Sequence, residues 1–467
     1  MSGSAIAQVL ALLALPVITR LFAPEDFGIL GIFLAVIGII GVMVCLRYEL
    51  TILLPKNEND AAHLYWLSLA SACVVTVLSL FIVAFYTEPI LEFLNAPGLE
   101  PYVWFIPAGI FLKGLHTANS HWNTRRAMFG RLATVDVGNS LITNGSKILF
   151  GVFGLISGGI LILSNLLGTT VAAMILGRNI YREDRKFLLK GIRWKRGVTL
   201  IREYKNISLF NTTGSLFNMF SQKAPLLLLT WLFNPAVAGY YLLADQLLKK
   251  PANFVIKAIK NVFFKKASTE QDNPKKLAEI TGLLTEAVTL FGLGFVTLMI
   301  TIAGPFAVII LGENWVSTGQ FIQWLSLYIL ILFVTNPISS LVTIKRKEHI
   351  VFFLHIGEMV LKLGALLIGG LYFKDPLQTI ILFSVVSFFY SLCTVPWLFS
   401  LSNSSVFRFF RVIGFPFLVS GITVAISLIL LKGEYFLSVI TINLIYAALY
   451  SYLTKETWIP VLRSVKP

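Results

Sequence analysis

The chain has 467 residues, of which 56% are hydrophobic and only 13% charged, and its formal net charge is +15. Soluble domains carry about 25% charged residues, so this composition excludes an ordinary soluble protein and indicates a chain surrounded mostly by lipid. The three cysteines lie far apart within apolar runs and fit neither a disulfide framework nor a metal site.

Apolar runs of about 20 residues, the length at which a helix spans a bilayer, recur along the whole chain. Fourteen candidates occur, at 3–22, 28–46, 63–86, 101–120, 133–155, 158–177, 208–232, 236–256, 281–311, 320–343, 350–371, 377–400, 412–431 and 435–453. The runs are continuous and lack the alternation of barrel strands, so they predict an all-α polytopic membrane protein. The two weakest candidates are the first, which is short, and the fifth, which is heavily polar.

The basic residues fall almost entirely on one side of this predicted bundle. With the N-terminus cytoplasmic, the inside connections hold 29 of the 38 Lys and Arg residues, whereas the outside connections hold only Lys374 and Lys432. Because Lys and Arg favour cytoplasmic loops, both termini are predicted to be cytoplasmic, and Arg20 is the one exception to the pattern. The positive net charge then follows from topology and requires no nucleic-acid partner.

The largest inside connection, 178–207, holds ten basic residues against three acidic ones. It is predicted to be a linker with an amphipathic segment on anionic headgroups, and a specific contact with phosphorylated lipid is the alternative. The linker divides the chain into an N-lobe of six helices (1–177) and a C-lobe of six helices (208–400). Helices 13 and 14 and a cytoplasmic tail (401–467) follow.

The two lobes share similar junctions. A Pro-x-x-x-Gly pattern at 24–28 recurs at 235–239, each time at the outer start of the second helix of a lobe. A small turn followed by tryptophan comes after the third and the ninth span, and Trp104 and Trp315 are expected at a membrane interface. Matched junctions of the same orientation predict a parallel pseudo-repeat, with the substrate site between the lobes.

The fifth span carries a polar stripe. Asp136, Ser140, Thr143 and Lys147 recur at spacings of four, three and four residues, with Asn144 alongside, which places them on one face of a helix. Lys147 has no acidic residue three or four positions away. A cation in the middle of a membrane costs at least about 2.5–3.5 kcal/mol, so it needs a partner, water or a function.

The seventh span has a similar pattern of polar residues around a lysine. Lys223 lies near its middle, again without an acidic residue three or four positions away, and Asn218 and Gln222 lie beside it. Two explanations stay open: cross-helix pairs, Lys147 with Asp245 or Lys223 with Asp136, and a cationic cavity for an anionic lipid headgroup. In the second explanation, Lys147 and Lys223 approach the headgroup from opposite lobes.

Other charged residues in the spans have a local explanation. Asp245–Lys249 and Glu358–Lys362 are spaced by four residues and are predicted to form self-neutralised pairs, with His355 on the same face as Glu358. Lys113 is a third candidate cation, which could also reach the headgroups. Asp136 and Asp245 are the carboxylates most able to bind H⁺ or Na⁺.

Motifs of enzyme chemistry are missing from the sequence. There is no P-loop, no pair of aspartates for a metal–nucleotide-sugar complex, and the five histidines form no ligand cluster. No cofactor or metal is therefore expected. The short outer connections count against a membrane-embedded polysaccharide polymerase or ligase, which would need reactive groups there.

Five runs of sequence carry a family resemblance: 16-PVITRLFAPEDFGILGIF, 47-RYELTILLPKNENDAA, 122-WNTRRAMFGRLA, 239-GYYLLADQLLKKPANFVIKAI and 311-LGENWVSTGQFIQWLS. They resemble the bacterial polysaccharide (O-antigen and lipid-linked oligosaccharide) flippases of the multidrug/oligosaccharidyl-lipid/polysaccharide exporter superfamily. The likeness covers the first ten spans and is only compositional after residue 350. Lys249 and Lys250, just before Pro251, depart from the less charged run that the family leads one to expect.

The resemblance implies two six-helix lobes around a central cavity in the bacterial inner membrane. It also implies an undecaprenyl-diphosphate-linked oligosaccharide as substrate, and polysaccharide polymerase and chain-length proteins as partners. The sequence thus predicts a flippase, not an enzyme, that works by alternating access. Its predicted substrate-binding residues are Lys147, Lys223, Lys113, Asn218, Gln222 and Asn144. The alternative within the superfamily is a cation-coupled multidrug exporter, whose cavity should instead be acidic.

Overall fold

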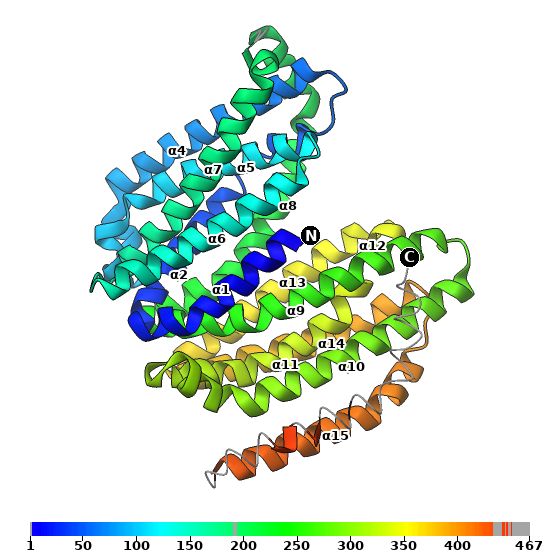
Figure 1. Cartoon of the computed structure of the whole chain (residues 1–467). Helices are drawn as coiled ribbons and strands as arrows, with labels where there is room; N and C mark the ends of the chain where they lie inside the picture. Colours follow the sequence, from blue (N-terminus) through cyan, green and yellow to red (C-terminus); the bar gives the residue numbers. More distant parts are fainter. Residues whose placement is uncertain (1, 190–193, 433–440, 444, 447–449, 451–467) are drawn as a thin grey trace. The chain divides into compact units, whose positions relative to one another are not determined.

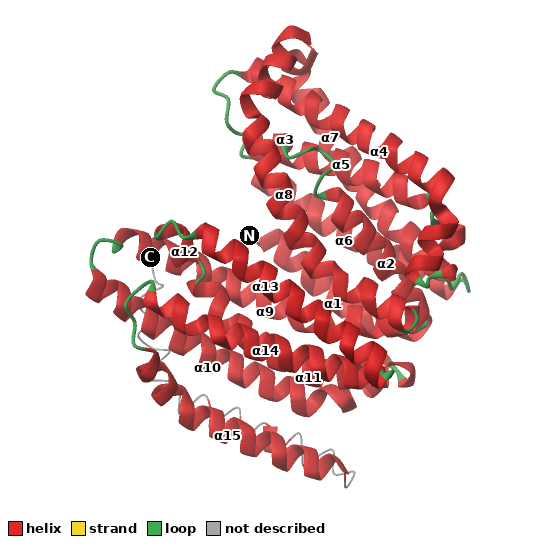
Figure 2. Ribbon diagram, turned by 180° about the vertical axis from the view of Figure 1, so that it is seen from behind, coloured by secondary structure: helices red, strands yellow, loops and turns green. Residues whose placement is uncertain are grey.

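The structure is a computed structural model, and it describes residues 2–189, 194–432, 441–443, 445–446 and 450. Within these residues every regular element is a helix (Figure 2). Each of the first thirteen predicted spans coincides with a long helix, whereas the fourteenth, 435–453, lies mostly outside the described residues. Eight of the described helices are long and apolar enough to cross a membrane, so the total of fourteen spans stays a prediction.

The chain folds into two compact units, residues 1–242 and 243–467, and the boundary falls within helix α9. Figure 1 labels the helices along the chain. The helices up to this point are α1 (Ser2–Leu21), α2 (Pro24–Gly41), α3 (Tyr48–Thr51), α4 (Glu58–Leu94), α5 (Phe105–Arg125), α6 (Phe129–Val152), α7 (Gly158–Leu189) and α8 (Trp194–Leu232), with a 3-10 turn at Pro97–Tyr102. From α9 onward they are α9 (Pro235–Thr269), α10 (Pro274–Phe306), α11 (Val316–Ile338), α12 (Ser340–Ile344), α13 (Glu348–Ile368), α14 (Pro376–Ser400) and α15 (Val406–Lys432), with short π- and 3-10 turns between α10 and α11 and after α13.

The boundary between the units falls later in the chain than the predicted linker. By its packing against α2 and α4, α8 belongs to unit 1. Lys147 and Lys223 therefore lie in the same compact unit. The division into lobes at 178–207, which follows from the sequence repeat, stays a prediction.

Short polar residues and prolines set the starts of several helices. At the start of α2, the Asp26 carboxylate accepts a hydrogen bond from the Ala23 backbone N–H at 3.0 Å, and Pro24 occupies the first turn. Asn273 and Asp375 are the N-cap residues of α10 and α14, and each accepts a hydrogen bond from the backbone N–H three residues later and is followed directly by proline. Such residues bind backbone N–H groups that have no partner within the helix, and proline lacks one such group.

The two Pro-x-x-x-Gly junctions of the sequence repeat pack against each other. A Cβ at Gly28 would lie 1.8 Å from the carbonyl oxygen of Pro235, and a Cβ at Gly239 would lie 2.0 Å from the carbonyl oxygen of Pro24. The contact is therefore reciprocal, and only glycine at positions 28 and 239 allows the backbones of α2 and α9 to come so close. The repeated motif thus builds one helix–helix contact from both of its copies.

At the opposite end of α2, unit 1 contains a network of arginines, which we call the basic end. Arg126 forms ion pairs with Glu58 at 3.2 Å and with Asp184 at 2.7 Å, and the fully buried Trp122 donates its indole N–H to Asp184 at 2.8 Å. Arg125 also pairs with Glu58, at 3.2 Å. The WNTRR run of the sequence therefore joins α4, α5 and α7.

Most of the predicted linker 178–207 is helical and is not a separate amphipathic segment. α7 continues to Leu189 and α8 begins at Trp194. With 32 and 39 residues, both helices are longer than the hydrocarbon core of about 30 Å requires at about 1.5 Å per residue. Arg196 pairs with Asp60 at 2.7 Å, which ties the start of α8 to α4 and lowers the pKa of the Asp60 carboxyl.

In unit 2, Trp315 differs from its expected role. Its side chain is fully buried, so it packs inside the protein and is not an exposed interfacial anchor, whereas Trp104 in unit 1 is 58% exposed. Gly312, with φ of 107°, makes the turn before it, and a Cβ at Gly319 would lie 2.7 Å from the carbonyl oxygen of Ala303. The LGENWVSTG run therefore packs the start of α11 tightly against the end of α10.

Candidate functional site

Two lysines from different helices lie along one surface of α2. A Cβ at Gly38 would lie 3.4 Å from Cε of Lys223, which comes from α8. A Cβ at Gly41 would lie 3.3 Å from Cγ of Lys113, which comes from α5. Gly38 and Gly41 are about one helical turn apart, so α5 and α8 bring two ammonium-bearing side chains to the same part of α2.

The glycines explain how the two lysines fit there. Without side chains, Gly38 and Gly41 leave room for the aliphatic stems of Lys223 and Lys113 to pack against α2. Lys113 is exposed and Lys223 is half-buried, so neither side chain is enclosed in the core of unit 1. Neither lysine has a carboxylate one turn away on its own helix to offset its charge.

Polar groups accompany Lys223 on α8. Asn218 and Gln222 are both exposed, and the Gln222 amide donates to the Asn218 side-chain oxygen at 2.6 Å. Met219 lies between them in sequence, and its sulfur is close to Gly38. Lys223 is nine residues from the end of α8, or about 13 Å along the helix axis. Exposed amides at this depth suit a polar environment better than hydrocarbon.

The polar stripe of α6 contributes to helix packing. Ser140 donates to the backbone oxygen of Ala7 in α1 at 2.8 Å, and Asn144 donates to the backbone oxygen of Ser140, also at 2.8 Å. On the side facing α7, a Cβ at Gly168 would lie 2.0 Å from the Thr143 hydroxyl oxygen. These contacts hold α6 between α1 and α7, so the role of Asn144 in substrate binding stays a prediction.

The remaining predicted residues of α6 are less accessible than Lys113. Lys147 is buried, with a relative exposure of 9%, and Asp136 is half-buried. The structure thus separates the predicted set into two groups. Lys113 and Lys223 both lie against α2, with Asn218 and Gln222 nearby on α8, whereas Lys147, Asn144 and Asp136 lie on α6.

Both predicted i,i+4 pairs are present in unit 2. Lys249 contacts Asp245 at 2.5 Å, and Lys362 contacts Glu358 at 2.5 Å. Asp245 therefore has a lysine ammonium directly beside it. Any ion that bound to Asp245 would compete with this ammonium, and the proposed coupling role of Asp245 must take that competition into account.

Sequence reasoning missed a buried carboxyl group at the basic end. Glu49 of α3 is 3% exposed, and its Oε1 lies 3.6 Å from a guanidinium nitrogen of Arg47, while its Oε2 has no hydrogen-bond partner among the described residues. Burial raises the pKa of Glu49, and Arg47 and His121 oppose this effect. The preceding residues Leu46 and Arg47 both have positive φ, which forms the tight turn that places Glu49 inside.

Sequence reasoning also missed Gly38 and Gly41, which lie against the stems of Lys223 and Lys113. It missed Tyr328 of α11 as well, whose ring lies 3.9 Å from the Lys362 ammonium. A signal for the glycines exists in the sequence, because Gly31, Gly38 and Gly41 recur at spacings near two turns and one turn of a helix. Which lysines would lie against them depends on tertiary packing, and no pattern in the sequence shows it. Tyr328 is one aromatic residue within a long apolar run, so nothing in the sequence distinguishes it from a core residue.

Comparison with known proteins bears on these features. Residues 17–320, more than half of the chain, match the sequence profile of the family described as polysaccharide biosynthesis protein. The chain belongs to this polysaccharide biosynthesis protein family. It is also 24% identical over 383 residues to the lipopolysaccharide biosynthesis protein WzxC of Escherichia coli (strain K12), an alignment that covers 79% of this chain and 74% of WzxC.

Solved structures extend the family assignment to the fold. The lipid II flippase MurJ, in an inward closed conformation, superposes with a TM-score of 0.74 at 12% identity, covering 97% of this chain and 98% of MurJ. An inward-facing multidrug resistance MATE family transporter of the MOP superfamily superposes with a TM-score of 0.69 at 14% identity, covering 85% of this chain and 96% of that one.

These comparisons confirm the resemblance that the sequence motifs indicated. This member of the polysaccharide biosynthesis protein family shares its fold with the MurJ flippase and with a MATE family transporter, and it is a multi-pass membrane protein. The two solved structures that superpose on it are a flippase and a transporter.

Proposed function

We propose that this chain moves an undecaprenyl-diphosphate-linked oligosaccharide across the bacterial inner membrane by alternating access. The observation that carries the proposal is the convergence of Lys113 and Lys223 on the glycine surface of α2, in a chain of the polysaccharide biosynthesis protein family. The chemistry of this surface supports an anionic headgroup as the substrate.

A diphosphate cannot enter the membrane without compensation for its charge, because an unpaired buried ion is prohibitively costly. Two lysines on different helices supply mobile positive charges that can meet such a group. Their stems are positioned by Gly38 and Gly41, and their own helices carry no carboxylate within one turn. A cationic surface of this kind selects an anionic headgroup and disfavours a cationic drug.

The oligosaccharide needs neutral hydrogen-bonding groups in addition to the cations. Asn218 and Gln222 offer amide donors and acceptors beside Lys223, and both side chains are exposed. We assign the diphosphate to Lys113 and Lys223, and sugar hydroxyls to Asn218 and Gln222. Lys147 would then support the site from α6, and Asp136 and Asp245 would be candidates for exchange of H⁺ or Na⁺.

The orientation follows from the distribution of basic residues. We propose that the connection 178–207, the basic end of unit 1 and both termini face the cytoplasm. On intact cells, a membrane-impermeant thiol reagent should label a cysteine at Gly98 and fail to label one at Lys195, in a background without the three native cysteines. Strong labelling at position 195 would reverse the orientation.

The substrate is tested with purified protein in liposomes, by the movement of a fluorescent lipid-diphosphate-linked sugar between leaflets. We expect Lys223→Ala and Lys113→Ala to reduce the rate at least about tenfold each, which corresponds to about 1.4 kcal/mol, within the range for one hydrogen bond to a charged group. Lys223→Arg should keep part of the activity because it keeps the charge.

Lys195→Ala is the matched control, because Lys195 is an exposed lysine at the start of α8, far along the helix from Lys223. Its transport rate should equal that of the unchanged protein. If the Lys113 and Lys223 variants also flip the lipid at the unchanged rate, the assigned site is wrong. If the unchanged protein fails to move the lipid, the substrate class is wrong.

A further inference from the structure

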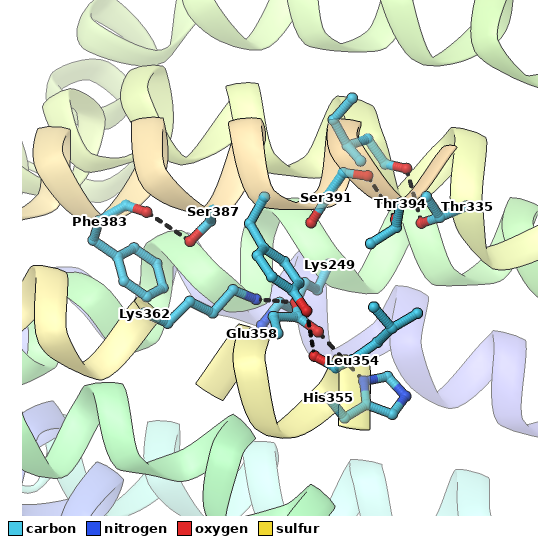
Figure 3. A network of polar contacts seen from close by, with 12 residues as sticks. Lys249, Thr335, Leu354, His355, Glu358, Lys362, Phe383, Ser387, Ser391 and Thr394 are labelled. Atoms are coloured by element: carbon cyan, nitrogen blue, oxygen red, sulfur yellow. Dashed lines mark hydrogen bonds and ion pairs between the residues drawn. The ribbon is translucent and has the colours of Figure 1, made fainter. Parts of the chain in front are cut away.

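Unit 2 contains a charged cluster that the proposed substrate site does not use. It is built from two lysine–carboxylate pairs, Lys249–Asp245 on α9 and Lys362–Glu358 on α13, both at 2.5 Å. Figure 3 shows Lys249, Glu358 and Lys362 grouped in the same region, with Ser387 and Ser391 of α14 alongside. If the cluster contained only these two self-neutralised pairs, its role would be to stabilise the packing of the helices.

One further residue changes that view. His355 lies one turn before Glu358 on α13, and its Nδ1 is 3.4 Å from Glu358 Oε2 (Figure 3). The His355 side chain is 60% exposed, whereas the side chains of Glu358 and Lys362 are 21% and 10% exposed. The two oxygens of one carboxylate are thus shared between a buried ammonium and an accessible imidazole.

Two tyrosines from neighbouring helices lie around the Glu358–Lys362 pair. Tyr328 of α11 places its ring 3.9 Å from the Lys362 ammonium and also lies close to Lys249. Tyr390 of α14 donates its hydroxyl to the Leu354 backbone oxygen at 2.5 Å, which fixes the turn of α13 that carries His355. Tyr328 gives the Lys362 ammonium a second favourable contact through its ring face.

The charge balance of the cluster depends on His355. With a neutral imidazole, Asp245, Lys249, Glu358 and Lys362 sum to zero charge. When the imidazole takes up a proton, the cluster gains one positive charge and Glu358 faces two cations. Histidine is the side chain whose ordinary pKa lies closest to neutral pH, and in this cluster the His355 side chain is the most exposed.

We propose that His355 and Glu358 form a proton-binding site in unit 2. A proton from water adds to the His355 ring, the imidazolium draws the Glu358 carboxylate towards itself, and the hold of Glu358 on Lys362 weakens. Lys362 then keeps its contact with Tyr328. The site couples proton binding to a rearrangement of charge between α13 and α11, and it rests on the proposed transport function only for the claim that this rearrangement drives flipping.

The binding step is tested without any substrate. In the full chain labelled with ¹⁵N-histidine and placed in lipid nanodiscs, the His355 ring signal is identified by its loss in His355→Gln. We expect this signal to change with pH, and the pH dependence of the change to differ in Glu358→Gln, because the contact between the ring and the carboxylate is then lost. An identical pH dependence in the two proteins would overturn the site.

Glu358→Gln leaves Lys362 without its carboxylate and could unfold the chain. Glu358→Gln/Lys362→Gln removes both charges of the pair and keeps the side chains similar in size, so it serves as the second variant. The pH dependence of the His355 signal should change in the same direction in both variants. A change seen in Glu358→Gln but absent in the double variant would assign it to Lys362 and contradict the proposal.

The coupling step is tested in liposomes with an imposed pH difference and the fluorescent lipid-diphosphate sugar. The rate for the unchanged protein should vary severalfold with the pH difference, and this variation should be lost in His355→Gln. His349→Gln is the matched control, because His349 is an exposed histidine on the same helix and should leave the variation intact. A pH dependence preserved in His355→Gln would overturn the coupling, whereas absent flipping by the unchanged protein at any pH would count against the proposed function and leave the titration result standing.

Discussion

Lysines occur inside both units, but the two units surround them differently. In unit 1, Lys113 and Lys223 pack their stems against Gly41 and Gly38 of α2, and their own helices supply no carboxylate within a turn. In unit 2, Lys362 contacts a carboxylate of its own helix at 2.5 Å, as does Lys249.

The difference separates two uses of the same side chain. A lysine paired within its own helix is neutralised at all times, so it stabilises a local arrangement and responds only when the pair is disturbed. Lys113 and Lys223 instead have stems that lie against glycines of α2 and no carboxylate within one turn on their own helices. The first arrangement suits a switch, and the second suits the binding of an anion.

The largest expected effect is on stability, when a lysine of each unit is replaced. The size of this effect should differ strongly between the two units. Lys362→Met leaves the Glu358 carboxylate without its ammonium, and breaking a buried ion pair in this way costs about 3–5 kcal/mol. Lys113→Met should change the free energy of unfolding by less than about 1 kcal/mol, because Lys113 is exposed. Thermal unfolding in nanodiscs measures both.

The double variant Glu358→Gln/Lys362→Met should recover most of the stability lost in Lys362→Met, since no uncompensated charge remains. If Lys113→Met unfolds the chain as readily as Lys362→Met, the two units do not differ in the way described.

A carboxylate can be placed beside Lys223 to convert it to the arrangement of unit 2. Met219 is one turn before Lys223 on α8, so Met219→Glu creates the spacing of Glu358 and Lys362. We expect transport to fall about tenfold, because the new carboxylate competes with the diphosphate for one charge-assisted contact of about 1.5–3 kcal/mol. The amount of folded protein should not change.

Met219→Gln, which has the same shape without the charge, should transport at close to the unchanged rate. Equal rates for Met219→Glu and the unchanged protein would show that the charge of Lys223 is not what the substrate meets.

The glycines of α2 can be tested for the space that they leave. A Cβ at Gly41 would be 3.3 Å from Cγ of Lys113, so Gly41→Leu should push the lysine stem away from α2. Overpacking of this kind costs about 1–3 kcal/mol, and we expect it to appear mainly as weaker substrate binding because Lys113 can move. Gly138 and Gly145 have open space around them, and Gly145→Leu should have little effect on binding. Equal affinities for the Gly41 and Gly145 variants would contradict the positioning role.

The smallest effect is expected at Glu49, whose buried carboxyl is a third arrangement of charge. Its pKa is raised in the folded chain, mainly by burial, so the folded state binds the proton more tightly than the unfolded state. The contribution of Glu49 is most favourable below the pKa of an unfolded glutamate and falls as the pH rises through the folded-state pKa. Glu49→Gln should remove this part of the pH dependence of thermal unfolding at pH values above the pKa of an unfolded glutamate. An unchanged pH profile in Glu49→Gln would show that the carboxyl is not buried in the folded protein.

Periodic features of the sequence were the most predictable. Long apolar runs fixed the positions of thirteen helices, because a helix that spans a membrane leaves little freedom in length or composition. The pairs Asp245–Lys249 and Glu358–Lys362 were predictable because their partners lie on one helix.

Features that depend on contact between distant segments were less predictable. The helical extension of α7 and α8 into the predicted linker was missed, since basic residues are compatible with either helix or loop. The polar stripe of α6 predicted one polar face of a helix and left open what that face meets, and the structure places the Ser140 hydroxyl against the backbone of α1. Periodicity shows that residues share a face, but it does not show what that face meets.

The contact of Gly28 and Gly239 with the carbonyl oxygens of Pro235 and Pro24 is formed by main chain on both sides. A contact between backbones keeps its shape when nearby side chains change, so the surrounding sequence can drift while four positions stay constrained. That constraint explains why a repeat was visible at these junctions in halves that otherwise share little. The effects of substituting the two glycines should therefore not be additive. Once one substitution has forced the helices apart, the second side chain finds room between them, so the loss of stability in the double variant should be smaller than the sum of the two single losses.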